Sequence, residues 1–102
     1  MEIQITGRNN FEITPPIRQH VIKQFEKVKK HFNNITNIHV ILMVLSKYQH
    51  KAEAHVDLPL GNLFAEETSE DMYASIDLVS KKIERQVVRH KEELKNHKGE
   101  GL

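Results

Sequence analysis

The chain has 102 residues, which is enough for one domain and one hydrophobic core. Its composition, 38% hydrophobic and 28% charged, is that of a globular protein and excludes a wholly disordered chain. The absence of cysteine excludes disulfides and thiolate metal sites, and the formal net charge of +1 says nothing by itself about nucleic acid. The first residues do not resemble a signal peptide, and no apolar run approaches the ~20 residues of a membrane span. We therefore expect a single cytoplasmic domain.

The first third of the chain predicts a strand followed by a helix. Residues 2–6 alternate apolar and polar side chains, which is typical of a half-buried strand, and residues 7–10 are turn formers. Thr14 before two prolines predicts a helix start. The apolar stripe of this helix has steps of three and four residues, and it consists of Ile17, Val21, Phe25, Val28 and Phe32.

Three further strands and a second helix are expected after the first helix. Residues 36–47, 51–58 and 63–68 predict the strands, with turns between them. Asp71 predicts the start of a long helix, either as its N-cap or as the acid of a capping box with Thr68. The apolar stripe of this second helix consists of Met72, Ile76, Val79, Ile83, Val87 and Leu94.

The order β-α-β-β-β-α predicts an α+β fold of two layers, with a four-stranded, mostly antiparallel sheet. Each helix has one apolar stripe, so we expect both helices to cover the same face of the sheet. Residues 1–97 would form this single domain, and residues 98–102 a short flexible tail.

Positive and negative charges are separated along the chain. Residues 15–32 contain five cations and one acid, whereas residues 52–71 contain six acids and no cation. A helical wheel places two basic ridges opposite the apolar stripes, one of Lys23, Lys27 and Lys30 and the other of Lys81, Lys82, Arg85 and Arg89. Two such ridges on one layer would suit phosphates. Ordinary solvated helix faces show a similar pattern, and this alternative stays open.

Other chemistry has little support in the sequence. Tyr73 could stack on a base, although a role in packing is the more usual one. The seven histidines form no HExxH motif and no pair at helical ligand spacing, so we expect no metal and no cofactor. There is no phosphate loop or nucleophile motif, and we expect no enzyme activity.

Several segments of the chain resemble the ribosome hibernation promoting factors of bacteria. They are Ile3-Gln-Ile-Thr-Gly7, Glu12-Ile-Thr14 and the block Glu70-Asp-Met-Tyr-Ala-Ser-Ile-Asp77 with its basic continuation. The resemblance runs from residue 2 to about residue 97. It implies a fold similar to double-stranded RNA-binding domains and binding to the small ribosomal subunit and its ribosomal RNA, over the messenger channel and the tRNA sites, which stops translation in stationary phase.

The resemblance also implies particular RNA-binding positions and a branch of the family. The matching basic residues are Arg18, Lys27, Lys82, Arg85, Arg89, Lys91 and Lys95. The short sequence after His97 favours the short form, which acts with a separate modulation factor to pair ribosomes as inactive dimers. The alternative is the related translation inhibitor, which inactivates single ribosomes.

Two rival hypotheses remain at this stage. A protein interaction module would use Ile41, Met43 and Leu45, which we expect to be exposed if the helices cover only one face of the sheet. A nonspecific RNA binder would have the same basic ridges without a ribosomal target. On the leading hypothesis the protein is a monomer away from the ribosome.

Overall fold

The computed structural model describes the backbone of residues 2–100 and the side chains of residues 2–94. Its elements, in chain order, are β1 (Ile3–Arg8), α1 (Pro15–Lys29), β2 (Asn37–Ser46), β3 (Gln49–Leu58), β4 (Gly61–Ser69) and α2 (Met72–Glu100). No helix in the described part of the chain is both long enough and apolar enough to cross a membrane.

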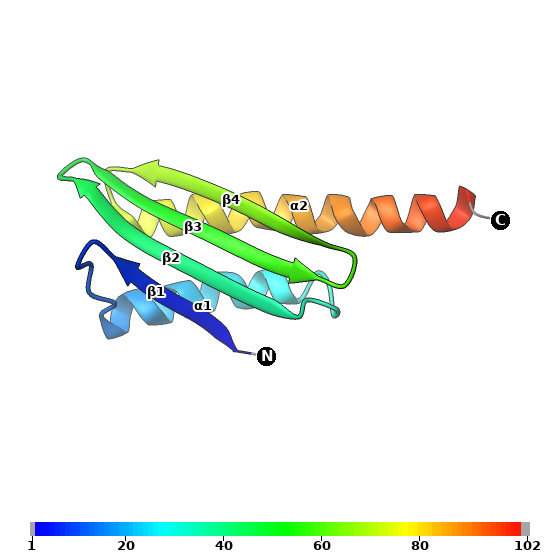
Figure 1. Ribbon diagram of the computed structural model, residues 1–102, viewed down its shortest axis with the longest axis horizontal. Coiled ribbons are helices and arrows are strands. Elements are labelled where there is room, and N and C mark those ends of the chain that lie inside the picture. The colour runs from blue at the N-terminus through cyan, green and yellow to red at the C-terminus, as the bar shows by residue number, and fades with distance from the viewer. Residues whose placement is uncertain (1, 101–102) are drawn as a thin grey trace.

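The four strands form one sheet in the order β1-β2-β3-β4, and both helices lie behind it (Figure 1). The pairs β2–β3 and β3–β4 are antiparallel, whereas β1 is parallel to β2 because α1 carries the chain back across the sheet between them. The predicted α+β fold of two layers is confirmed, with a mixed sheet that is mostly antiparallel.

The connection between β1 and α1 needs particular residues. A Cβ atom at Gly7 would collide with the backbone carbonyl of Phe11, so only glycine fits there. Asn9 and Asn10 both have positive φ angles, of 54° and 64°, a conformation that asparagine tolerates better than most residues. The chain then enters α1 at Thr14, which is extended and is followed by proline in the first turn.

The start of α2 is fixed by its N-cap. The Asp71 carboxylate accepts a hydrogen bond from the Ala74 amide at 3.1 Å, which satisfies one of the free N–H groups of the first turn. Asp71 is therefore the N-cap itself, the first of the two predicted roles.

The core lies between the sheet and the helices and contains the predicted apolar stripes. Phe25 and Val21 of α1 and Ile76, Ile83 and Val87 of α2 are completely buried. The inward faces of the strands meet them, and their fully buried side chains are Ile38, Val40, Leu42, Ala52, Ala54 and Val56. The last predicted members of the two stripes, Phe32 and Leu94, are only half-buried.

The expected exposure of the second apolar face of β2 is wrong for two of its three residues. Ile41 is 3% exposed and Met43 is 8% exposed, and only Leu45, at 51%, is open to solvent. Met43 lies in register between Arg8 and Lys51, whose long aliphatic stems can cover a neighbouring apolar side chain. The sheet face without helices therefore lacks the continuous apolar strip that a protein interaction module would need.

The predicted tail overlaps the end of α2. The helix continues to Glu100, and residues 101–102 lie outside the described residues. The division into a domain of residues 1–97 and a tail of residues 98–102 stays a prediction.

Candidate nucleic-acid interface

Two histidine–carboxylate contacts join α2 to α1 and to the turn that follows α1. His20 Nε2 lies 2.6 Å from an oxygen of Asp77, and His31 Nε2 lies 3.1 Å from an oxygen of Glu84. Both contacts are part-buried. Each directs a carboxylate oxygen of α2, from Asp77 or Glu84, toward a histidine of the neighbouring segment.

The outer face of α2 carries an exposed cationic row of Lys81, Arg85 and Arg89. These residues are four positions apart, so they lie on one face and extend over about 12 Å of the helix. Within residues 2–94, the structure places no carboxylate in ion-pair contact with any of the three. Their charges are therefore available to an external anion.

The outer face of α1 carries the second row, which consists of Lys23, Lys27 and Lys30. All three side chains are exposed. The Lys27 ammonium donates to the Gln24 amide oxygen at 3.4 Å, a contact with a neutral group that leaves the positive charge uncompensated. The structure thus brings the two predicted ridges onto one layer, as the sequence pattern indicated.

Lys82 differs from the other residues of its predicted ridge. It lies on the flank of α2 that faces β4, where its ammonium is 3.4 Å from the Glu67 carboxylate. The neighbouring Gln86 on the same flank donates to the Phe64 carbonyl of β4 at 3.1 Å. The charge of Lys82 is therefore partly neutralised within the protein.

Lys91 and Lys30 face the same hollow at the end of α1. They line a hollow of about 290 Å³ together with His31, Phe32 and the two asparagines that follow. Lys91 thus adds a further exposed cation at this end of the helical layer. The side chain of Lys95, another predicted binding residue, lies outside the described residues.

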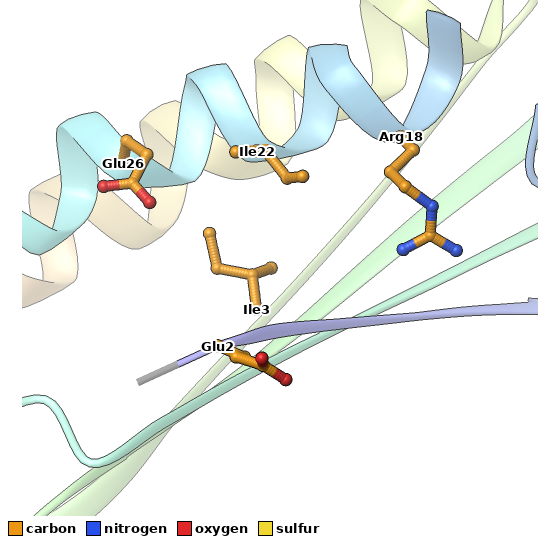
Figure 2. A pocket seen from close by; sticks show the side chains of 5 residues that line it. All are labelled: Glu2, Ile3, Arg18, Ile22 and Glu26. Carbon is orange, nitrogen blue, oxygen red and sulfur yellow. The ribbon is translucent and has the colours of Figure 1, made fainter. Parts of the chain in front are cut away.

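Arg18 does not join either row. It lies on the flank of α1 that faces β1, in a hollow shared with Ile22 and Glu26 of the same helix (Figure 2). The structure therefore separates this predicted binding residue from the outer face of the helical layer.

Tyr73 packs against the helix interface. Its ring meets the His20 ring edge to face, with the centroids 5.1 Å apart, and the residue remains 39% exposed. The structure places it beside the His20–Asp77 contact. Its role as a stacking residue stays a prediction.

Sequence reasoning missed the functions of His20 and His31. The periodicity of a helix does not show which residues of another element Asp77 and Glu84 face. No local signal shows these contacts, because His20 lies on α1 and His31 in the turn after it, and both partners lie on α2.

The described residues contain no group of three or more side chains able to hold a metal ion. A two-layer α+β domain with two rows of exposed cations on its helices is typical of a small nucleic-acid-binding protein. Residues 3–95 match the family model described as Sigma 54 modulation protein / S30EA ribosomal protein, and the chain belongs to this family of ribosome-associated factors.

Similar proteins cover nearly the whole chain. The ribosome hibernation promoting factor of Pseudomonas putida is 41% identical over 92 residues, which cover 90% of this chain and 88% of the relative. The factor of the same name from Escherichia coli is 38% identical over 97 residues, which cover 95% of this chain and 100% of the relative. The resemblance to short hibernation promoting factors is confirmed.

Solved structures support the same fold. A ribosomal subunit interface protein from Coxiella burnetii has a TM-score of 0.82 at 33% identity and covers 90% of this chain and 99% of its own. The N-terminal domain of Protein Y from Thermus thermophilus has a TM-score of 0.80 at 36% identity, and the match covers 88% of this chain and 99% of that one.

Proposed function

We propose that this protein is a ribosome hibernation factor. It binds the small ribosomal subunit through ribosomal RNA, near the messenger channel and the tRNA sites, and it inhibits translation in stationary phase. The protein then acts in the cytoplasm, and it acts by binding the ribosome rather than by catalysis. The names of its relatives support a role in ribosome hibernation, and the two rows of exposed cations support RNA as the contacted surface.

The observation that carries the RNA contact is the uncompensated row Lys81, Arg85 and Arg89. Cations that already pair with carboxylates add little to phosphate binding, whereas free cations release counterions from the nucleic acid. Asp77 and Glu84 face His20 and His31, whereas Glu92 lines a hollow together with Arg85 and Arg89. None of the ion pairs within residues 2–94 includes Lys81, Arg85 or Arg89, so the three charges can meet phosphates.

The test of this function is charge reversal on α2. Arg85→Glu combined with Arg89→Glu should abolish co-sedimentation with ribosomes, because two charges in the proposed contact change sign and its net charge falls by four units. The circular dichroism spectrum should stay that of the wild type, since both side chains are exposed. If the double variant still sediments with ribosomes, the α2 face is not the contact.

A matched control is available on other surfaces of the protein. Arg8→Glu with Lys47→Glu makes the same change in net charge at two exposed residues of the sheet layer. This variant should sediment with ribosomes nearly as well as the wild type. A loss equal to that of the α2 variant would mean that net charge alone, rather than a defined surface, governs binding.

Two forms of hibernation are compatible with this site. We favour the form that promotes inactive ribosome dimers together with a separate modulation factor, because the relatives named hibernation promoting factors match over most of their own length. The alternative form inactivates single ribosomes. Sucrose gradients of stationary-phase lysate distinguish them: the protein travels with ribosome dimers in the first case and with single ribosomes in the second.

A further inference from the structure

The hollow between α1 and β1 has a composition unlike that of the cationic rows. It has a volume of about 430 Å³ and is lined by Glu2, Ile3, Arg18, Ile22 and Glu26. Figure 2 shows Arg18 and Glu26 at opposite ends, with Ile22 between them on α1 and Ile3 facing it from β1. Along the hollow, the hydrogen-bond donors of Arg18 are thus followed by two apolar side chains and then by the acceptor oxygens of Glu26.

The middle of the hollow is apolar and open. Ile22 is 38% exposed and is one of the few large apolar side chains of the described residues that face solvent to this extent. Ile3 is half-buried beneath it. A flat apolar group placed between these two side chains would remove surface from water, which favours binding.

The two ends of the hollow are too far apart to neutralise each other. Arg18 and Glu26 are eight positions apart, which is about 12 Å along a helix. One Glu26 oxygen accepts from the Lys29 ammonium at 3.2 Å, so the other oxygen can serve a ligand. Glu2 is exposed beside Ile3, and the five residues together have one positive and two negative charges. A phosphate is therefore a poor occupant.

We propose that this hollow binds an unpaired guanine base of single-stranded RNA. Guanine has acceptors, O6 and N7, on one edge, and arginine is the side chain that most often contacts them. Its Watson–Crick edge has N–H donors, which a carboxylate such as Glu26 accepts. The ring itself lies against Ile3 and Ile22. Both edges of guanine are free only when the base is outside a duplex.

This inference rests on the proposed function in one respect, because the base would come from the bound ribosomal RNA. It adds base recognition to a protein whose cationic rows contact only backbone. It also gives Arg18, which lies away from both rows, a separate task from the phosphate contacts. A base contact would select one position on the RNA, whereas phosphate contacts select none.

The test uses the whole protein with isoleucine methyl groups labelled for NMR. It is titrated with a single-stranded adenosine pentanucleotide and with the same strand carrying guanosine at its centre. We expect the guanosine strand to shift the Ile3 and Ile22 methyl signals and to bind at least about fivefold more tightly. Replacing guanosine by inosine, which lacks the exocyclic amine, should remove much of this preference.

Two variants locate the preference in the hollow. Glu26→Ala removes the proposed acceptor and should abolish the preference for guanosine. Glu93→Ala removes the same charge from an exposed position on α2 and should keep it. Equal binding of all strands, or guanosine binding without shifts at Ile3 and Ile22, overturns the inference. A lysine-rich peptide that shifts these methyl signals where the guanosine strand does not would assign the hollow to a protein partner instead.

The outcome is separable from that of the ribosome test. The Arg85→Glu and Arg89→Glu variant should lose ribosomes yet keep the ratio between guanosine and adenosine strands. A wild-type protein that prefers guanosine but does not bind ribosomes would contradict the proposed function and leave this site in place. A wild-type protein that binds ribosomes but shows no base preference would support the proposed function and contradict this site.

Discussion

His39 shows how one residue of the open sheet face responds to its neighbours. Its ring nitrogen Nε2 lies 2.8 Å from the Thr6 hydroxyl, and its ring centroid lies 6.4 Å from that of His55. Partial burial, and then the positive charges of His55 and Arg8, lower the pKa of His39. The folded protein therefore takes up a proton at this position less readily than the unfolded chain does.

The lowered pKa of His39 predicts a loss of stability in acid. Between the lowered value and the ordinary value of 6.5, the unfolded chain binds more protons, so the free energy of unfolding falls as the pH falls. His39→Gln removes this titration and should make the free energy of unfolding less dependent on pH below 6.5. Urea denaturation of both proteins at several pH values measures the difference. An unchanged pH dependence would mean that other groups govern acid stability.

At the scale of elements, the interface between α1 and α2 determines the spacing of the cationic rows. The contact His20–Asp77 joins α1 to α2, and the contact His31–Glu84 joins the turn after α1 to α2. Each contact also directs a carboxylate oxygen of α2 toward a histidine. The geometry of the helical layer and its charge are thus set by the same side chains.

A double-mutant cycle measures the first of these contacts. His20→Ala and Asp77→Ala should show a coupling free energy of about 0.2–1 kcal/mol, the usual range for ion pairs that are partly open to solvent. The matched cycle of His20→Ala with Glu93→Ala should show none. Coupling in the control pair would indicate a general change of the helix rather than the contact.

At the scale of the whole molecule, charge is distributed by layer. The rows of exposed cations lie on the helices, whereas the acidic segment of the sequence forms β3, β4 and the turn into α2. Two of these acids form ion pairs with lysines of the protein. The Lys51 ammonium lies 3.0 Å from the Glu66 carboxylate, and the Lys82 ammonium lies 3.4 Å from the Glu67 carboxylate. The hydrogen bond from Lys51 to Glu66 is the main reason that the pKa of Lys51 is raised.

This arrangement predicts the salt dependence of ribosome binding. The affinity should fall steeply with salt, because binding to phosphates releases counterions. Arg85→Gln with Arg89→Gln should make the slope of log affinity against log salt shallower by about two, or one for each lost phosphate contact. Lys82→Gln should change the slope less than either arginine, because its charge is shared with Glu67. Filter binding at several salt concentrations checks both statements.

Much of the fold could be predicted because the features involved are local. The stripe containing Phe25 and the stripe containing Ile83 repeat at helical spacing, and each had only the sheet to pack against. The N-cap at Asp71 depends on a few adjacent residues. The two cationic rows follow from the same periodicity, since residues opposite an apolar stripe must face solvent. Among the residues of the predicted rows, Lys82 is the exception, because its charge is partly neutralised by Glu67 of another element.

The sequence by itself determined the elements, the buried face of each helix and the residues that make up the cationic rows. The tertiary structure alone decided that Ile41 is covered, that His20 meets Asp77 and that Arg18 lies apart beside β1. These outcomes involve side chains brought together from separate elements. Periodicity shows which way a side chain points from its own backbone, and only the packing of elements shows what it meets there.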